Sequence, residues 1–145
     1  MSHLEVSISN GIATLTMNRP KARNALSMEM RSELCSALHD VEIDTSVRCV
    51  VLNGEGDHFM AGGDVKGMGE TIKKPADAIK KEFMLRIHDL HPIMFAMRRM
   101  PKPIIASCRG AAAGAGVSMA LACDLVIASE DVFFTLAYCK IGTSP

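Results

Sequence analysis

The chain has 145 residues, which is the size of a single domain. Hydrophobic residues make up 48% and charged residues 22%, the balance of a folded globular protein rather than a disordered one. The 16 basic and 16 acidic residues give a net charge of zero, so we expect no nucleic-acid partner and no membrane partner.

The cysteines argue against a disulfide framework. Their number, 5, is odd, and no Cys-x-x-Cys pair or Cys/His cluster occurs, so we expect no structural zinc. Four of them lie in apolar stretches, which favours reduced core residues: Cys35, Cys49, Cys108 and Cys123. There is no basic and apolar leader, and no apolar run reaches the ~18 residues of a membrane span. These features predict a cytoplasmic protein.

The first third of the chain predicts a hairpin, a helix and a strand. Apolar residues alternate on both sides of Asn10-Gly11, a pair that favours a hairpin turn because both positions need a positive φ. Pro20 ends the second strand. Ser27 is a helix N-cap, and apolar residues then recur at helical spacing up to Val41. The β-branched run over residues 47–52 predicts a buried strand.

The rest of the chain alternates between loops, helices and strands. Glycines punctuate residues 54–69, which predicts a functional loop. A charged helix is expected over residues 75–100, with an interruption before Pro92. Further elements are a strand at 104–108, a helix at 115–122, and strands at 125–128 and 133–134. This order predicts an α/β protein with one continuous core and no internal domain boundary.

Two segments rich in small residues, 58–66 and 103–116, lie at strand-to-helix transitions. Unpaired N–H groups at such transitions attract negative charge. If the two turns converge, their amides form an oxyanion hole, which suits reactions in which a carbonyl becomes an enolate. Tight turns and close helix packing are the alternative reason for glycines there, at Gly62 and Gly63 and over residues 114–116.

Four collinear segments resemble the crotonase family, the enoyl-CoA hydratase/isomerase superfamily: residues 18–26, 59–66, 101–106 and 120–129. The resemblance implies a crotonase-like spiral of ββα units, of which residues 1–145 are the N-terminal core domain, truncated before the C-terminal helical region. It also implies an acyl-CoA or enoyl-CoA substrate and a homotrimer or hexamer of the full-length protein. Coenzyme A would be part of the substrate, with no separate cofactor and no metal.

Carried over position by position, the resemblance makes the backbone N–H groups of Gly63 and Ala115 the oxyanion donors. It places the CoA moiety along nine residues: Lys21, Ala22, Arg23, Ala61, Gly62, Asp64, Val65, Lys66 and Gly114. Solvated side chains are the alternative interpretation of Arg23 and Lys66. His58 is expected to be a turn residue rather than a catalytic one.

The chain departs from the family at the catalytic positions. Hydratases of this family use two glutamates, and the matching residues here are Ser118 and Tyr138. Neither is a carboxylate that could activate water and return a proton, although both could hydrogen-bond a substrate or serve the fold alone. Some isomerase-like members carry an Asp directly after the position of Pro145. The sequence therefore favours double-bond isomerisation of an enoyl-CoA over hydration.

Other functions stay open at this stage. One is a non-catalytic acyl-CoA-binding or scaffold protein, and another is a different crotonase chemistry, such as thioester hydrolysis or decarboxylation. A dinucleotide site is poorly supported, because the glycines at 110, 114 and 116 do not have the Gly-x-Gly-x-x-Gly spacing. We also expect the 145-residue chain alone to expose apolar faces over residues 115–122 and 125–128, and therefore to self-associate.

Overall fold

Five strands form the main layer of the molecule. A computed structural model describes residues 2–65, 69 and 71–138. The main sheet has the order β1-β2-β3-β4-β6. Its strands are β1 (Leu4–Ser9), β2 (Ile12–Met17), β3 (Cys49–Gly54), β4 (Ile104–Cys108) and β6 (Leu125–Ala128). A second sheet pairs β5 (Ala111–Ala113) with β7 (Phe133–Thr135) in parallel.

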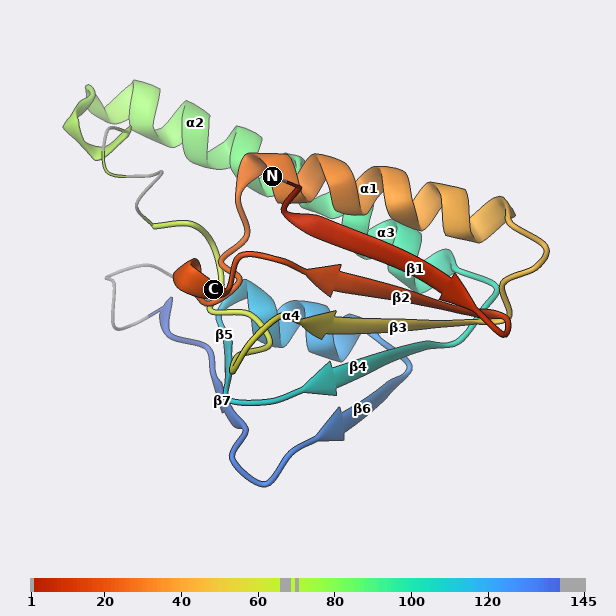
Figure 1. The fold of residues 1–145 in the computed structure, drawn as a ribbon. Coiled ribbons are helices and arrows are strands. Elements are labelled where there is room, and N and C mark those ends of the chain that lie inside the picture. Colours follow the sequence, from red (N-terminus) through yellow and green to blue (C-terminus); the bar gives the residue numbers. More distant parts are fainter. Residues whose placement is uncertain (1, 66–68, 70, 139–145) are drawn as a thin grey trace.

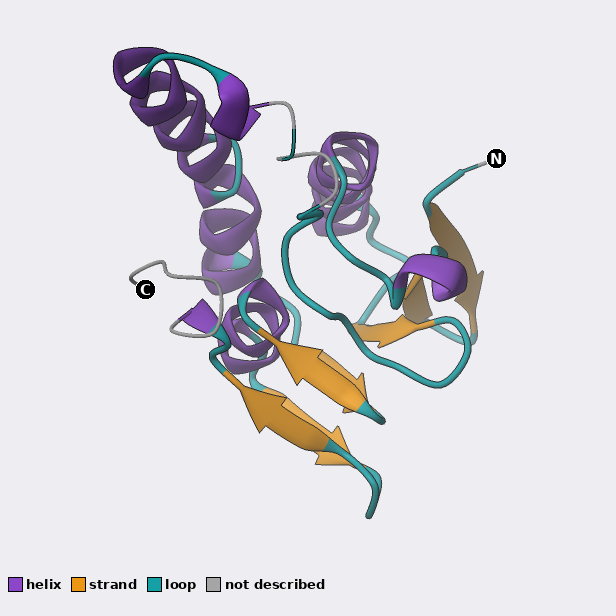
Figure 2. Ribbon diagram, turned by 90° about the vertical axis from the view of Figure 1, so that its left-hand side faces the viewer, coloured by secondary structure: helices purple, strands orange, loops and turns teal. Residues whose placement is uncertain are grey.

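The helices lie on one side of the main sheet, and in Figure 2 α2 and α3 follow one another in a line. The helices are α1 (Met28–Ile43), α2 (Ala76–His88), α3 (His91–Arg99) and α4 (Ala115–Ala122), with 3-10 turns η1 (Pro20–Ala22) and η3 (Thr71–Lys73). The α/β class predicted from the sequence is confirmed. Among the described helices, none combines the length and apolar character needed to cross a bilayer.

The expected hairpin opens the sheet. Asn10 and Gly11 have φ values of 52° and 81°, and β1 pairs antiparallel with β2. All remaining neighbours in the main sheet, β2 with β3, β3 with β4 and β4 with β6, are parallel. As Figure 1 shows, the carboxyl ends of these parallel strands therefore lie at one edge, where η1, β5 and β7 also lie. Loops at that edge are where open α/β sheets build their binding sites.

Local signals account for α1. The Ser27 hydroxyl accepts a hydrogen bond from the Met30 amide at 3.1 Å, which is the predicted N-cap. The helix then buries its apolar face, including Leu34 and Val41, against the sheet and α3. Together with β-strand residues such as Leu15 and Leu52, these side chains form the one continuous core that the sequence predicts.

The structure moves the bounds of one strand, confirms the interruption of one helix and adds one strand. The strand predicted at 47–52 runs from Cys49 to Gly54, because the parallel ladder with β2 continues to the pair Met17 and Gly54. The helix predicted over 75–100 is two helices, and the break at residues 89–90 fits the interruption expected before Pro92. Strand β5 was not expected from its three alanines, since its pairing with β7 and its bridge to Met60 make it a strand.

The cysteines separate into two groups. Cys108 and Cys123 are buried, and burial raises the pKa of their thiols to about 11 and about 12, so both stay protonated at neutral pH. Cys49 is half-buried. The prediction of a core residue is wrong for Cys35, which is exposed on α1 next to the buried Leu34, because the apolar face of the helix does not include it.

Candidate active site

The candidate site is built from segments that follow the carboxyl ends of the parallel strands. Residues 18–26 follow β2, residues 55–65 follow β3, and residues 109–114 follow β4. These ranges contain most of the site residues expected from the sequence. In Figure 1 they come together at the edge of the sheet where the strand arrows end.

Backbone hydrogen bonds join the middle segment to the first one. The Ala61 amide donates to the Arg23 carbonyl at 2.9 Å, and the Leu26 amide donates to the Gly62 carbonyl at 2.7 Å. The Asp64 amide returns to the Leu26 carbonyl at 3.3 Å, so Leu26 forms a parallel β-bridge with Gly63. This short ladder fixes the chain on both sides of Gly63.

The other side of the middle segment binds the third one. The Phe59 amide donates to the Arg109 carbonyl at 2.9 Å, and the Met60 amide donates to the Ala111 carbonyl at 3.0 Å. The Ala113 amide then donates to the Met60 carbonyl at 2.9 Å. Residues 59–64 are therefore held between the two other segments, and the first and third motifs are brought to the same place through them.

The two glycine turns touch. Gly62 has a φ of 96°, and a Cβ built on it would lie 2.9 Å from the Ala113 carbonyl oxygen and 3.6 Å from the Ala115 nitrogen. A Cβ on Gly114, where φ is 50°, would lie 3.8 Å from the Gly62 Cα. Both residues are buried. Glycine is needed at both positions for its positive φ, and at Gly62 also because the neighbouring backbone is too close for a side chain.

The amides of Gly63 and Ala115 flank this contact. Ala115 is the first residue of α4, so its N–H has no partner inside the helix. Within the described ranges, neither of the two amides donates to another backbone carbonyl outside the regular elements. Both residues are half-buried. Two donors near a turn contact, one of them at the positive end of a helix dipole, are suited to binding an oxygen that carries negative charge.

Asn24 supports the site, and sequence reasoning did not single it out. Its side chain is fully buried and donates to the carbonyls of Glu55 and His58 at 2.9 and 2.7 Å, while its Oδ1 accepts from the Arg19 amide at 2.9 Å. Its φ is 56°, a left-handed conformation that asparagine tolerates. An amide side chain that both donates and accepts can satisfy such a turn, but its partners are distant in sequence.

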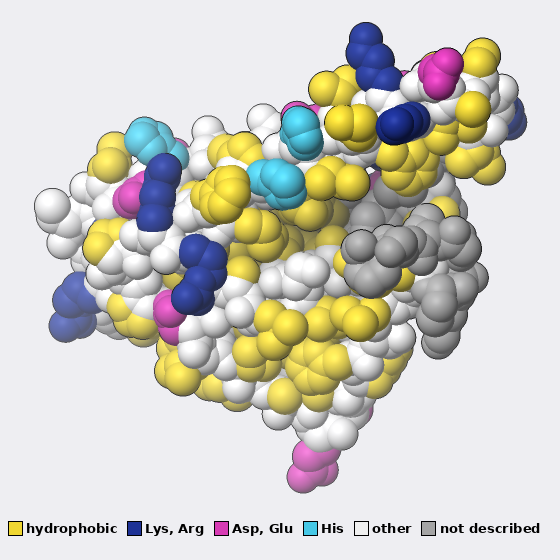
Figure 3. All heavy atoms as spheres, turned by 180° about the vertical axis from the view of Figure 1, so that it is seen from behind, with side chains coloured by type: hydrophobic (Ala, Val, Ile, Leu, Met, Phe, Trp, Pro, Cys, Tyr) yellow, Lys and Arg dark blue, Asp and Glu magenta, His cyan; other side chains and the backbone are white. Residues whose placement is uncertain are grey.

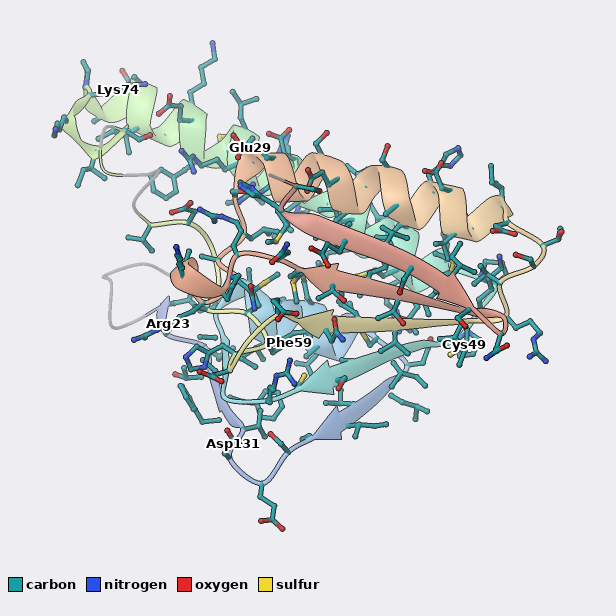
Figure 4. All side chains as sticks on the ribbon, in the orientation of Figure 1. Arg23, Glu29, Cys49, Phe59, Lys74 and Asp131 are labelled. Atoms are coloured by element: carbon teal, nitrogen blue, oxygen red, sulfur yellow. The ribbon has the colours of Figure 1, made fainter. Side chains whose placement is uncertain are left out.

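The expected CoA-binding residues that the structure describes lie on these three hydrogen-bonded segments, which we call the crossing. Lys21 and Arg23 are exposed around η1, and Figure 4 shows Arg23 at the edge of the molecule. Ala22 and Ala61 are half-buried, and Val65 is exposed. The ladder brings Arg23 and Ala61 together. Lys66 lies outside the described residues.

Asp64 lies where the second segment meets the first. Its carboxylate accepts from the Arg19 guanidinium, with 2.9 Å between Nη2 and Oδ2, so it holds the first and second segments together. A direct contact of this carboxylate with the CoA moiety is not needed to explain its position. Arg19 was not among the predicted site residues, because a pairing across 45 positions has no local signal in the sequence.

The two residues at the glutamate positions are both half-buried. Ser118 lies in the first turn of α4, where its amide donates to the Gly114 carbonyl at 3.3 Å. Tyr138 follows β7. His58 directly follows the turn at residues 56–57, and its Nδ1 accepts from the Ala111 amide at 3.1 Å. In the part of the chain that is described, no three His, Cys, Asp or Glu side chains are grouped as metal ligands.

The protein has an α/β fold in which two glycine turns meet where the parallel strands end. Comparison with known proteins gives the family. The family described as "Enoyl-CoA hydratase/isomerase" matches residues 7–145. The chain belongs to this family, as the four motifs indicate.

Relatives with different activities are similarly close. The chain is 36% identical to 1,2-epoxyphenylacetyl-CoA isomerase of Escherichia coli K12, covering 100% of this chain and 53% of the isomerase. It is also 36% identical to 4-chlorobenzoyl coenzyme A dehalogenase-2 of Arthrobacter, covering 97% and 50%. A solved enoyl-CoA hydratase from Polaromonas sp. JS666 superposes with a TM-score of 0.89 at 36% identity, covering 98% and 54%. The chain thus spans about half the length of these relatives.

Proposed function

We propose that the protein binds acyl-CoA thioesters and stabilises an enolate of the acyl group, with the amides of Gly63 and Ala115 as an oxyanion hole. The observation that carries this proposal is the contact between the Gly62 turn and the Gly114–Ala115 turn, which brings the amide at the start of α4 to the turn that holds the other donor. The CoA-linked names of the relatives support the substrate class.

The chemistry follows from where charge develops. When a base removes a proton from the α-carbon of a thioester, the negative charge moves to the carbonyl oxygen. Two N–H donors and the start of α4 stabilise that oxygen more than they stabilise the neutral carbonyl, and one such donor is worth roughly a hundred- to a thousandfold in rate. Because the donors belong to backbone that is hydrogen-bonded on both sides, they need little reorganisation during the reaction.

The cationic residues near η1 suit the CoA end of the substrate. Lys21 and Arg23 are exposed, the Arg23 carbonyl binds the Ala61 amide, and positive charge there attracts the CoA phosphates. We assign the CoA moiety to the groups named in the sequence analysis, including Lys66. Asp64 contributes its backbone and its pairing with Arg19 rather than a charge toward the phosphates.

Within the family, we propose double-bond isomerisation of an enoyl-CoA rather than hydration. Hydration needs a carboxylate to activate water and a second group to return the proton, and Ser118 and Tyr138 supply neither carboxylate. One acid suffices for isomerisation, because it can remove the proton and redeliver it elsewhere. Thioester hydrolysis, decarboxylation and non-catalytic binding remain the alternatives. We further propose a cytoplasmic trimer or hexamer that uses no cofactor beyond the CoA of its substrate.

Binding and proton exchange should be measured together. Calorimetry with crotonyl-CoA reports binding, and NMR in D2O reports exchange at the acyl protons that become acidic when the carbonyl is polarised. Binding with exchange indicates an enzyme, whereas binding without exchange indicates a binding protein. An acyl-CoA that does not bind at all contradicts the proposal.

The donors can be removed one at a time. Ala115→Pro removes the amide at the first helical position, where proline is best tolerated, and Gly63→Pro removes the other donor. We expect each variant to lose proton exchange by about a hundredfold or more while free CoA still binds. Unchanged exchange in both folded variants would exclude the assigned oxyanion hole.

A further inference from the structure

A single guanidinium spans two of the segments that build the site. The Arg19 Nη2 atom lies 2.9 Å from Asp64 Oδ2, and its Nη1 donates to the Ala25 carbonyl at 2.5 Å. The two charged side chains are only 19% and 22% exposed, so water screens the pair less than it screens a surface ion pair.

The two acceptors of this guanidinium flank the Gly63 amide. Asp64 directly follows Gly63, and Ala25 directly precedes Leu26, the bridge partner of Gly63. The hydrogen bond of the ladder next to Asp64 is its longest: the Asp64 amide lies 3.3 Å from the Leu26 carbonyl oxygen. The Leu26 amide, by contrast, lies 2.7 Å from the Gly62 carbonyl oxygen. Arg19 therefore ties both strands of the ladder together where its backbone bonding is poorest.

Arg19 is itself firmly held. Its amide donates to Asn24 Oδ1 and its carbonyl accepts from the Asn24 amide, both at 2.9 Å. The fully buried Asn24 also binds the carbonyls of Glu55 and His58. The guanidinium thus projects from a fixed base toward the ladder. Its planar fork reaches two acceptors at once, which a lysine ammonium on a flexible stem does less well.

We infer that Arg19 is a positioning residue for the oxyanion hole: its pairing with Asp64 and the Ala25 carbonyl fixes the Gly63–Asp64 side of the ladder, where the backbone bond is longest, and so keeps the Gly63 N–H in place. The Leu26 amide already holds the Gly62 carbonyl, which belongs to the same peptide as the Gly63 N–H, so the freedom that remains lies on the Asp64 side of Gly63, where Arg19 binds. A rotated peptide turns the donor away from the oxygen, and hydrogen bonds weaken steeply with misalignment. Because this role requires that Gly63 bind the thioester oxygen, it rests on the proposed function.

The absorption of a bound chromophoric substrate reports directly whether the two amides donate to its thioester carbonyl. Cinnamoyl-CoA conjugates an aromatic ring with the thioester carbonyl, so polarisation of the carbonyl moves its absorption to longer wavelength. At saturation we expect a red shift in the wild-type chain. We expect most of that shift to be lost in Arg19→Gln and in the isosteric Asp64→Asn, with an intermediate shift in Arg19→Lys. The dissociation constant should rise about tenfold or less, since the CoA contacts remain.

A matched control separates this role from general stability. Arg99 pairs with Glu42 at 3.1 Å on the far helices, and we expect Arg99→Gln to keep the full red shift. Amide hydrogen exchange provides a readout that needs no ligand. The Leu26 and Asp64 amides should lose about tenfold or more of their protection in Arg19→Gln, and none in Arg99→Gln.

The outcomes are distinct. A folded Arg19→Gln chain that gives the full red shift, or that keeps the protection of both amides, overturns the inference and leaves the proposed function intact. A wild-type chain that binds cinnamoyl-CoA without any red shift overturns the proposed function, and the inference with it. Loss of the shift and of the protection in Arg19→Gln and Asp64→Asn, with the control unchanged, supports the inference.

Discussion

Two regions with similarly apolar side chains differ in burial: one lies inside the molecule and the other lies at its surface. Phe59, in the segment held between the other two motifs, is fully buried, and Figure 4 shows it inside the molecule. Phe133, on β7, is 53% exposed, and Leu125 and Ile127 on the edge strand β6 are 59% and 62% exposed. Hydrophobic side chains gather in Figure 3 on the part of the surface that holds α4, β6 and β7.

The difference shows which part of the site this chain builds by itself. The crossing of residues 23–26, 59–64 and 109–116 is held together by backbone hydrogen bonds between its three segments, and its large apolar side chains Leu26, Phe59 and Met60 are buried. The face over β6 and β7 presents apolar side chains at the end of the sheet. Within α4, by contrast, only Leu121 is a large exposed apolar residue, so the exposed face expected over 115–122 is smaller than predicted.

The largest effect is expected at the crossing, from Asn24→Ala. This change leaves the Arg19 amide and the carbonyls of Glu55 and His58 without their partner in a buried place. We expect the free energy of unfolding to fall by about 4 kcal/mol, measured by urea denaturation.

Asn53→Ala is the matched control for this prediction. Its Oδ1 is buried and has no hydrogen-bond partner among the described residues, so its removal should change stability by less than about 1 kcal/mol. Equal losses in the two variants would show that the Asn24 hydrogen bonds do not hold the crossing together.

Gly116→Ala tests how closely the turns approach one another. A Cβ at this position would lie 2.4 Å from the Met60 carbonyl oxygen, so backbone must move apart to admit it. We expect a loss of about 3 kcal/mol in the free energy of unfolding, and a weaker red shift of bound cinnamoyl-CoA. In Gly114→Ala the nearest atom is 3.6 Å away, and only the strain of φ 50° remains, about 1–2 kcal/mol. The reverse order of the two losses would contradict this geometry.

At the exposed face the effect should be on association rather than on folding. Leu125→Lys and Ile127→Lys place charge on the edge strand, which should suppress self-association in sedimentation velocity. Because both side chains are exposed, the free energy of unfolding should change by about 0.5 kcal/mol or less. Thr45→Lys adds the same charge at an exposed position on the other side and should leave association unchanged. A monodisperse wild-type chain would refute the account of this face.

The smallest effect concerns the turn between β6 and β7. The Ser129 hydroxyl donates to Asp131, and this hydrogen bond is the main reason why the pKa of the Asp131 carboxyl lies below its ordinary value. A lowered folded-state pKa contributes stability above the unfolded-state value, and the contribution is lost as the pH falls through the folded-state pKa. Ser129→Ala should therefore be slightly less stable than wild type at pH 6 and indistinguishable from it at pH 2 to 3. A difference that persists at the lower pH would point to another cause.

Local signals predicted much of the fold, and distant pairings explain what was missed. The Asn10-Gly11 turn and the Ser27 cap depend on neighbouring residues, and both were found from the sequence. Strand β5 and the Arg19–Asp64 pair exist only because separate segments meet, and a single sequence carries no signal for such meetings. The exposed Cys35 shows that an apolar neighbourhood does not determine which helix face a residue occupies.

For the candidate site, the family resemblance located the turns and the structure supplied their contacts. The convergence of the Gly62 and Gly114 turns was only a condition in the sequence, and it is now an observed contact. The roles of Ser118 and Tyr138 stay predictions, as do those of the CoA-binding residues, because they depend on a bound substrate.

One measurement tests the central claim most directly: isotope-edited infrared spectroscopy of crotonyl-CoA labelled with ¹³C at the thioester carbonyl. If the amides of Gly63 and Ala115 both donate to this oxygen, the carbonyl stretch of the bound ester moves to lower frequency, and Ala115→Pro and Gly63→Pro each reverse part of the shift. A bound ester whose carbonyl stretch equals that of free crotonyl-CoA in water, in a folded wild-type chain, would contradict the assignment.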